Sequence, residues 1–321
     1  MSGRVRVDSA PVTLAELAKS SARRLARARL TYGHGTDNPL DEAAALLFHA
    51  LDLDHEDAPH IYARIVNPAE RRRVERLIER RIRERRPAAY LMGRMWFAGL
   101  EFKVDKRVLV PRSPIAELIV GGFRPWIEPQ RVRRVLDIGT GSGCIAIACA
   151  YAFARARVDA TDISAAALTV ARMNIRRHRL ASRVSAIRGD LFGGLGRRRY
   201  DIIVSNPPYV ATKEWRALPA EYRHEPRIAL ESGSQGLDAV TRIVREAERH
   251  LRPGGILVVE VGDTQAALER TYPRVPFLWL EFERGGGGVF LLTREQLAAH
   301  RDAFSERDGA SERHFRRRRP R

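Results

Sequence analysis

Cysteine is scarce in this chain. Its 321 residues include two cysteines, Cys144 and Cys149, and both lie in the apolar run CIAIACAYAF. A pair in such a run is typical of small buried side chains, which argues against a disulfide framework and against a cysteine-based metal site. We therefore expect no metal ion.

Long apolar runs are missing too. No uninterrupted apolar stretch reaches the length that a membrane-spanning helix requires. Residues 1–30 contain an arginine-rich amphipathic segment without the apolar core and small-residue cleavage site of a secretory signal. These absences predict a soluble protein of the cytoplasm, with no transmembrane helix.

Lysine is rare although the chain is strongly basic. The formal net charge is +18, and only four of the 57 basic residues are lysines, at positions 19, 103, 106 and 213. The positive charge suits a protein that works close to polyanions such as nucleic acid or ribonucleoprotein. A GC-rich coding bias produces the same excess of arginine, so composition leaves both interpretations open.

Helical periodicity dominates the first 95 residues. Thr13 and Glu16 have the spacing of a capping box, and Asn67 followed by Pro68 is a cap with proline at the first helical position. We expect residues 1–95 to form a small helical domain. Its nine arginines between 71 and 86 indicate either solvated surface or a contact with RNA or protein. The expected helices cover 13–30, 41–51 and 68–86.

A hairpin and a junction follow this domain. Residues 96–110 alternate apolar and polar positions around Gly99 and Asp105, which predicts a β-hairpin. The sequence PRSP at 111–114 closes it. We expect residues 96–114 to connect the helical domain to a second domain.

Strand-like apolar runs alternate with helical ones over residues 115–297. This alternation predicts an α/β domain, with a mostly parallel sheet covered by helices. The last two runs flank Gly285–Gly288, which predicts an antiparallel hairpin at the edge of the sheet. Residues 298–321 end in HFRRRRPR and predict a basic, disordered tail. The expected strands cover 132–138, 157–162, 184–188, 200–205, 256–261, 277–282 and 289–293.

The first strand of this domain runs into a glycine-rich loop, DIGTGSG, at 137–143. Its glycines let the backbone approach a ligand closely before a helix N-terminus. The dinucleotide-binding fingerprint requires glycine or alanine where this chain has Cys144, which weakens a dehydrogenase interpretation. Asp162 ends the second strand, where it is placed to accept hydrogen bonds from ribose hydroxyls. Asp190 ends the third strand, near an expected adenine.

The sequence Asn206-Pro207-Pro208-Tyr209 follows the strand expected at 200–205. The carboxyl ends of parallel strands are where open α/β sheets bind their ligands. The Asn206 side-chain oxygen and the Pro207 carbonyl can both accept from one planar NH2 group, and the Tyr209 ring can stack on its face. A plain proline turn is the alternative, and these four residues alone do not decide between the two.

The order of glycine loop, acid, acid and NPPY resembles the class I methyltransferases that use S-adenosylmethionine. This resemblance implies a Rossmann-like fold, with a mostly parallel seven-stranded sheet whose last strand is antiparallel, beside the helical domain. It implies that Asn206, Pro207, Pro208 and Tyr209 bind the substrate, with Asn206, Pro207 and Tyr209 in catalysis. It also implies cofactor contacts from Asp137, Gly139, Thr140, Gly141, Ser142, Gly143, Asp162, Asp190, Leu191, Phe192 and Asn206.

Within that class, NPPY is shared by amino methyltransferases of nucleic acids and by protein glutamine methyltransferases. The helical domain, hairpin and PR junction resemble the glutamine group over about Leu14 to Leu297. This resemblance implies that the helical domain, residues 1–95, recognises the substrate. The junction PRSPI at 111–115 resembles the branch that acts on ribosomal protein L-three of the large subunit, whereas the release-factor branch typically has PRPETE. That branch is also supported by YGHGTDNP at 32–39, LPAEYRHEP at 218–226 and VPFLWLEF at 275–282.

This resemblance implies N5-methylation of a glutamine in ribosomal protein L-three, free or in the assembling large subunit, in support of ribosome assembly. The basic surface suggests an additional contact with rRNA and none with a membrane. His34 and His224 lie in the resembling stretches, but the chemistry gives them no task and we expect structural roles. Three alternatives stay open: a release-factor methyltransferase, a nucleic-acid amino methyltransferase and a non-catalytic RNA-binding or assembly protein.

Overall fold

The computed structural model describes residues 11–53, 58–283 and 285–305. By their contacts these residues divide into two compact units. One is a helical unit, which extends to Gly93 and also includes Pro219–His224. The other is a sheet unit, which comprises Arg94–Leu218 and the chain from Glu225 onward. In the described part of the chain, no helix is both long and apolar enough to cross a membrane.

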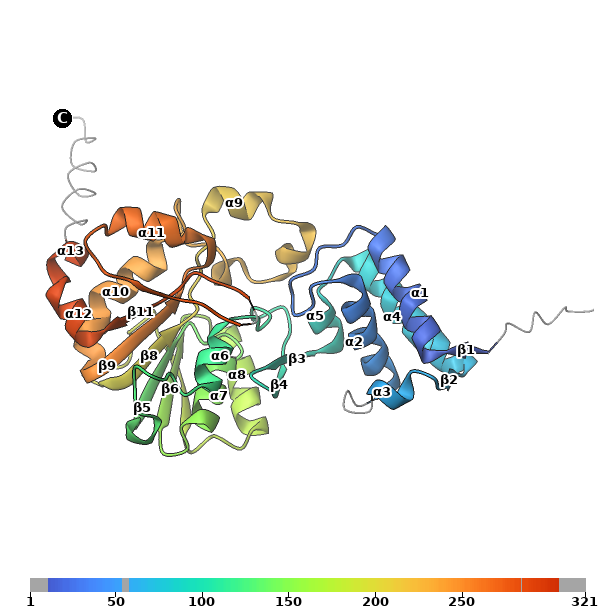
Figure 1. Ribbon diagram of the computed structural model, residues 1–321, viewed down its shortest axis with the longest axis horizontal. Helices are drawn as coiled ribbons and strands as arrows, with labels where there is room; N and C mark the ends of the chain where they lie inside the picture. The colour runs from blue at the N-terminus through green and yellow to red at the C-terminus, as the bar shows by residue number, and fades with distance from the viewer. Residues whose placement is uncertain (1–10, 54–57, 284, 306–321) are drawn as a thin grey trace, which may run out of the picture. The chain divides into compact units, whose positions relative to one another are not determined.

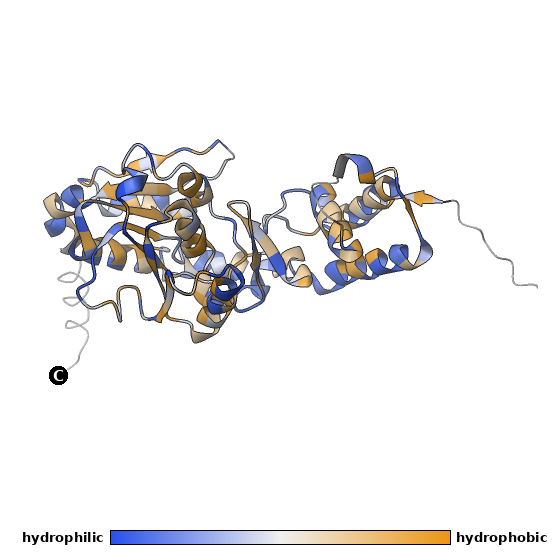
Figure 2. Ribbon diagram, turned by 90° about the horizontal axis from the view of Figure 1, so that it is seen from below, coloured by the Kyte–Doolittle hydropathy of each residue, from blue (hydrophilic) through white to orange (hydrophobic). Residues whose placement is uncertain are grey.

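The helical unit contains the three expected helices, α1, α2 and α4 (Figure 1). Both predicted caps are confirmed, because the Thr13 and Asn67 side chains each accept from the backbone three residues on, where Glu16 and Glu70 complete capping boxes. Hydrophilic and hydrophobic residues alternate along these helices (Figure 2), and their apolar sides form one buried cluster. The elements are β1 (Val12–Thr13), α1 (Leu14–Arg27), α2 (Pro39–Leu51), α3 (Ala58–Ile61), β2 (Ile65–Val66), α4 (Pro68–Glu84) and α5 (Ala88–Met92).

A short segment that follows NPPY by about ten residues belongs to the helical unit, which the sequence did not indicate. This segment, a 3-10 helix over Ala220–His224, inserts Glu221 among buried charges. Glu221 accepts from the Thr31 backbone at 3.1 Å and pairs with Arg85 at 2.7 Å. The fully buried Arg81 lies 3.8 Å away and donates to Glu42 at 2.8 Å. Breaking such a buried network by removing one partner is costly, so the segment is firmly held.

The hairpin at the start of the sheet unit is earlier and shorter than the sequence predicted. Its strands are β3 (Arg94–Phe97) and β4 (Leu100–Lys103), paired antiparallel. Ala98 and Gly99 form the two-residue turn with φ of 50° and 75°, the left-handed conformation that such turns require. Asp105 lies beyond the hairpin, where it accepts two hydrogen bonds from the Arg107 side chain.

A seven-stranded sheet forms the centre of the sheet unit, in the order β10-β11-β9-β8-β5-β6-β7. Strands β5 to β9 are parallel, and β11 runs antiparallel between β9 and β10. The predicted parallel sheet and final antiparallel hairpin are therefore confirmed. The strands are β5 (Arg134–Ile138), β6 (Arg157–Asp162), β7 (Val184–Arg188), β8 (Tyr200–Ser205), β9 (Leu251–Glu260), β10 (Leu278–Leu280) and β11 (Val289–Thr293).

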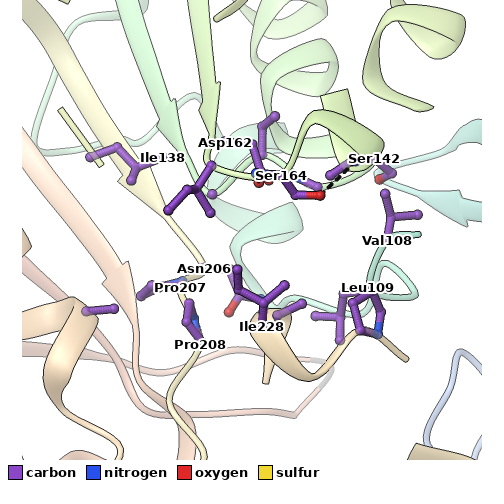
Figure 3. Close-up of a pocket in the computed structure, with 18 of the residues that line it drawn as sticks. Val108, Leu109, Ile138, Ser142, Asp162, Ser164, Asn206, Pro207, Pro208 and Ile228 are labelled. Carbon is purple, nitrogen blue, oxygen red and sulfur yellow. Dashed lines mark hydrogen bonds between the residues drawn. The ribbon is translucent and has the colours of Figure 1, made fainter. Parts of the chain in front are cut away.

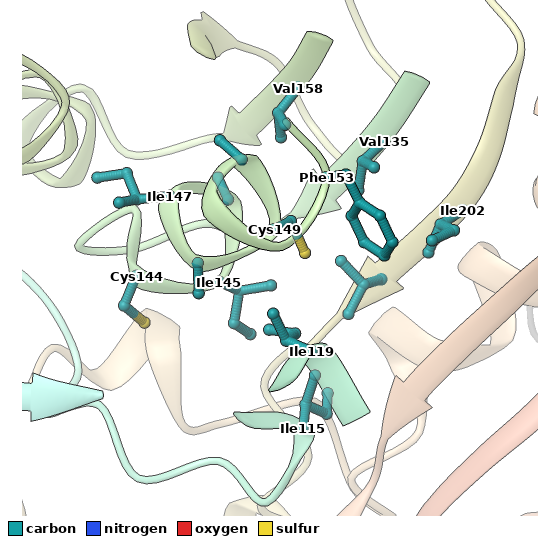
Figure 4. Packing of buried hydrophobic residues seen from close by; sticks show 14 of the residues in the cluster. Ile115, Ile119, Val135, Cys144, Ile145, Ile147, Cys149, Phe153, Val158 and Ile202 are labelled. Atoms are coloured by element: carbon teal, nitrogen blue, oxygen red, sulfur yellow. The ribbon is translucent and has the colours of Figure 1, made fainter. Parts of the chain in front are cut away.

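Helices cover both faces of this sheet, and each face has its own apolar core. On one face, Ile115 and Ile119 of α6 and the almost entirely buried α7 pack on Val135 and Ile202 (Figure 4). Cys144 and Cys149 lie in α7 as buried free thiols, as expected. Helices α6 (Ile115–Val120), α7 (Cys144–Ala152) and α8 (Ala165–Arg177) contribute to this core; α10 (Asp238–His250), α11 (Gln265–Thr271), α12 (Arg294–Ala299) and α13 (Arg301–Ser305) contribute to the other.

The sheet unit also contains short connecting helices at its edges. Of these, α9 (Thr212–Ala217) follows NPPY, and the others are 3-10 helices over Pro129–Arg131, Arg227–Ala229 and Gly262–Thr264.

The start of the predicted disordered tail is helical instead. Phe304 of α13 is 2 % exposed and packs in the second core. Arg301 donates to Glu248 of α10 at 2.7 Å. A buried aromatic ring overrides the polar composition of residues 298–305, because its apolar surface is removed from water. Residues 306–321, the rest of that prediction, lie outside the described residues.

Candidate active site

A cavity of about 340 Å³ lies at the carboxyl ends of β5, β6 and β8, within the sheet unit. This volume is in the range of small-molecule sites. Asp162 and Ser164 line one side, and Asn206, Pro207 and Pro208 line the opposite side (Figure 3). The predicted glycine loop and NPPY therefore face one space, as expected where parallel strands end together.

The glycine loop adopts a conformation that suits glycine. Gly139, Gly141 and Gly143 have φ of 72°, 54° and 82°. A Cβ added at Gly141 would meet nothing within 4 Å, whereas one at Gly143 would lie 3.3 Å from Ala171. Gly143 therefore serves helix packing and does not line the cavity. The predicted cofactor residues that do line it are Gly139, Thr140, Gly141, Ser142, Asp162, Asp190, Leu191 and Asn206.

Asp162 is held rigidly at the end of β6. Its two carboxylate oxygens accept from the backbone of Gly141 at 2.9 Å and of Ser164 at 2.8 Å. Burial raises its pKa above the ordinary value, and these two hydrogen bonds oppose the shift. Each carboxylate oxygen can accept more than one hydrogen bond, so the site retains acceptor capacity toward the cavity.

Asp137 lies beneath the glycine loop and not on the cavity wall. Its Oδ2 accepts from the Thr140 hydroxyl at 2.5 Å and from the Ala146 backbone at 3.1 Å. Its Oδ1 is buried and has no hydrogen-bond partner among the described residues. Burial raises its pKa to about 7. Asp137 therefore holds the loop and the start of α7, which differs from the direct cofactor contact that the resemblance implied.

Asp190, Leu191 and Phe192, three of the expected cofactor residues, differ in position. Asp190 lines the cavity and forms a bidentate salt bridge with Arg242, with hydrogen bonds of 3.1 and 2.8 Å. Leu191 also lines the cavity, with φ of 51°. Phe192 is 5 % exposed and stacks on His250 with ring centroids 4.7 Å apart, in the second core. Leu191 therefore lies at the cavity and Phe192 away from it.

Three of the four NPPY residues line the cavity and one does not. Asn206, Pro207 and Pro208 line the cavity, whereas Tyr209 is absent from the lining. The Tyr209 hydroxyl donates to Glu260 at 3.0 Å, and its ring passes so close to Gly262 that an added Cβ there would lie 2.7 Å from it. Burial raises the Tyr209 pKa, with the negative charge of Glu260 as the next cause. Tyr209 therefore lies against Gly262 and Glu260, and its expected stacking on a substrate stays a prediction.

Two buried carboxylates lie beside the site, and only Glu260 was not considered in the sequence. Glu225 accepts from Arg112 at 2.7 and 2.8 Å and from the Val110 backbone at 2.9 Å. Glu260 is 5 % exposed at the end of β9. A signal existed for Glu260, because it is the charged residue that ends the apolar run ILVVE beside the NPPY strand. Glu225 lies in the stretch LPAEYRHEP that supports the resemblance, and the sequence suggests that Glu225, Pro226 and Arg227 belong to a loop that covers the substrate.

The segment after Glu225 forms part of the cavity wall. Pro226, Ile228 and Ala229 line it, and Ile228 is 56 % exposed. Val108 and Leu109, which precede the PRSPI sequence, line it as well, and Figure 3 shows Leu109 near Ile228 and Val108 near Ser142. The cavity therefore has apolar side chains in addition to the polar groups at the ends of the strands.

The two histidines have structural contacts in the helical unit. His224 forms a hydrogen bond with the Glu84 carbonyl at 3.0 Å. His34 is 4 % exposed, with its ring centroid 4.4 Å from that of Tyr222. In the described part of the chain, no group of three or more His, Cys, Asp or Glu side chains is arranged to hold a metal ion.

The sheet order and the cavity at its strand ends define the class of protein. Residues 124–221 match the family described as Methyltransferase small domain, and residues 21–93 match the PrmC N-terminal domain. The protein is a class I methyltransferase, with the Rossmann-like sheet that the motif order implied. Among solved structures, a methyltransferase from Pyrococcus furiosus is 22% identical, with a TM-score of 0.45 over 61% of this chain and 89% of that one.

Relatives with curated names specify the family. The ribosomal protein uL3 glutamine methyltransferase of Xanthomonas campestris is 48% identical over 92% of this chain and 95% of its own length. The protein of the same name from Neisseria gonorrhoeae is 48% identical over 89% of this chain and 95% of its own. The chain belongs to the family of ribosomal protein uL3 glutamine methyltransferases.

Proposed function

We propose that this protein transfers a methyl group from S-adenosylmethionine to the side-chain amide nitrogen of a glutamine in ribosomal protein uL3. The observation that carries the proposal is the position of Asn206 and Pro207 on the cavity wall opposite Asp162. The names of the family members support the glutamine of uL3 as the acceptor.

The residues present fit S-adenosylmethionine. Asp162 offers carboxylate oxygens for ribose hydroxyls, the glycine loop offers close backbone approach, and Leu191 and Ile163 offer apolar surface to an adenine. Asp190 is paired with Arg242, so both belong to the polar rim of this half of the cavity. When bound, the cofactor supplies a methyl group on a sulfonium, which is already activated for transfer.

An amide nitrogen is a poor nucleophile because its lone pair is delocalised into the carbonyl group. We propose that the Asn206 oxygen and the Pro207 carbonyl accept the two N–H groups of the substrate glutamine and orient its nitrogen toward the methyl donor. Proline at 207 and 208 fixes φ there, so these acceptors are held in place before the substrate binds. The nitrogen loses its extra proton after transfer, so no strong base is required.

Three apolar side chains of the cavity lining fit the substrate. They belong to Ile228, Val108 and Leu109, and Ile228 lies near Asn206 in Figure 3. We propose that they contact the aliphatic part of the glutamine side chain and exclude water from the reacting amide. Exclusion of water strengthens the hydrogen bonds to Asn206 and Pro207.

A contact with rRNA is a further part of the proposal. The outer side of α4 carries exposed arginines at 72, 73, 76, 80 and 83, with Glu79 among them. Arginine side chains in such a row bind phosphate groups in a salt-dependent way. We propose that this row holds the enzyme near the assembling large subunit in the cytoplasm, where ribosomal proteins meet rRNA.

The test is labelled methyl transfer, with ribosomal protein uL3, a release factor, RNA and DNA offered separately to wild type and to Asn206→Ala. We expect label in uL3 at a glutamine, located by fragment mass, and a loss of about 10²- to 10³-fold or more in the variant. Arg131→Ala, at an exposed position outside the cavity, is the matched control. Label in nucleic acid would replace the proposal with amino methylation of a base, and label in the release factor would replace the substrate.

A further inference from the structure

Asn206 and Glu260 are neighbours at the carboxyl ends of two adjacent parallel strands. The last pair in the register of β8 and β9 is Ser205 with Val259; Asn206 is the first residue after β8, and Glu260 is the last residue of β9. Side chains alternate between the two faces of a sheet. Val258 contributes to the first core, so Glu260, two residues further on, belongs to that same face.

Glu260 accepts hydrogen bonds from two hydroxyl groups beside the NPPY sequence. The Ser113 hydroxyl and the Tyr209 hydroxyl both donate to it, Tyr209 at 3.0 Å. Burial raises the Glu260 pKa, while hydrogen bonds from Ser113, Tyr209 and Asn206 and the nearby charge of Arg112 oppose the shift. A buried carboxylate with this many donors is well satisfied and holds its partners in fixed positions.

The chemistry of the pair determines the orientation of the Asn206 amide. Both carboxylate oxygens of Glu260 accept hydrogen bonds from hydroxyl groups, and an accepting oxygen interacts favourably only with the NH2 end of Asn206. The oxygen and nitrogen of an amide point in different directions from its carbon. With the NH2 group turned to Glu260, the Asn206 oxygen is left for a donor in the cavity. A substrate amide needs such an acceptor.

We propose that Glu260 is a positioning residue of the methyl transfer, which holds the Asn206 amide with its oxygen available to the substrate NH2 group. The inference rests on the proposed function. Tyr209 then acts through Glu260 and not by stacking on the substrate. Ser113, in the PRSPI sequence after the hairpin, donates to Glu260 and belongs to the same hydrogen-bond network.

The direct test compares Glu260→Gln with wild type and with the control Glu128→Gln, an exposed position. Gln can accept or donate, so it no longer selects one orientation of Asn206. We expect kcat to fall by about tenfold or more, with cofactor affinity within twofold of wild type and cooperative unfolding retained. An unchanged kcat would overturn the inference, as would a loss of cofactor affinity equal to the loss of kcat.

A double-mutant cycle tests whether Glu260 acts through Asn206. In single-turnover assays, Glu260→Gln should lower the rate of methyl transfer when Asn206 is present. It should have little further effect on that rate in the Asn206→Ala background. Effects that multiply would mean that Glu260 acts independently and would overturn the proposal. Tyr209→Phe removes one donor from Glu260 without changing its charge, and we expect a smaller loss of kcat in the same direction. It serves in place of Glu260→Gln if that variant does not fold.

A readout without substrate separates this inference from the proposed function. With asparagine selectively labelled, the side-chain NH2 signal of Asn206 is assigned by its absence in Asn206→Ala. Glu260→Gln should shift that signal and speed its hydrogen exchange, and Glu128→Gln should not. If Glu260→Gln leaves the Asn206 NH2 signal and its hydrogen exchange unchanged, the inference is overturned even if uL3 is methylated. A clear shift without uL3 methylation would instead refute the proposed substrate.

Discussion

Arg112 donates two hydrogen bonds to Glu225, at 2.7 and 2.8 Å, and thereby joins the PRSPI junction to the chain that follows the NPPY region. The Glu225 side chain is fully buried, and it also accepts from the Val110 backbone. Residues on both sides of this pair line the cavity. The pair therefore fixes two walls of the site relative to each other.

The first prediction concerns this pair. Glu225→Gln should raise KM for uL3 severalfold, because the walls that hold the substrate side chain lose their common anchor, while cofactor affinity changes little. Loss of a buried charged partner should also cost about 1–3 kcal/mol of stability. Kinetics with each substrate varied, together with thermal unfolding, measure both effects. A change in cofactor affinity alone would contradict the assignment.

Asp162 provides the second prediction. Asp162→Ala should weaken binding of S-adenosylmethionine by about 10- to 100-fold, because a charge-assisted hydrogen bond contributes about 1.5–3 kcal/mol. Titration calorimetry measures this affinity for S-adenosylmethionine. Asp162→Asn is the matched control, since its oxygen can still accept from the Gly141 or Ser164 backbone. Unchanged affinity in Asp162→Ala would refute the ribose role.

Asp137 gives a pH dependence of stability. Burial raises its pKa from 3.8 to about 7, so the folded state binds this proton more tightly than the unfolded chain does. The stability that this raised pKa gives the folded state is fully present below pH 3.8 and is lost as the pH rises through about 7. The melting temperature of wild type minus that of Asp137→Asn should therefore decrease between about pH 4 and 7 and be constant above pH 8. A constant difference over the whole range would contradict it.

The C-terminal helix gives the fourth prediction. Removal of residues 301–321 deletes Phe304 from the second core and should destabilise the protein by about 3–5 kcal/mol. Removal of residues 306–321 alone leaves Phe304 in place, and we expect an unchanged melting temperature. If these basic residues bind rRNA, the shorter deletion should lower activity on ribosomal particles more than on free uL3. Equal losses on both substrates would exclude that role.

Local patterns in the sequence were sufficient for most of the architecture. The caps at Thr13 and Asn67, the alternation of strands and helices and the glycines near 285 depend on interactions between residues close in the chain. The hairpin at 94–103 was misplaced because alternation continues past Lys103, and only pairing shows where a strand ends. The helix at 301–305 was missed because one buried ring, Phe304, decides it.

The family, the parallel sheet and the motifs at its strand ends could be predicted from the sequence, because each depends on the order and spacing of residues along the chain. The side chains that reach the cavity could be identified only in the folded protein. Leu191 lies there and Phe192 does not, and Tyr209 turns to Glu260. Such choices depend on burial and on partners that lie far apart in sequence, as Ser113 and Glu260 do, and spacing along the chain does not encode them.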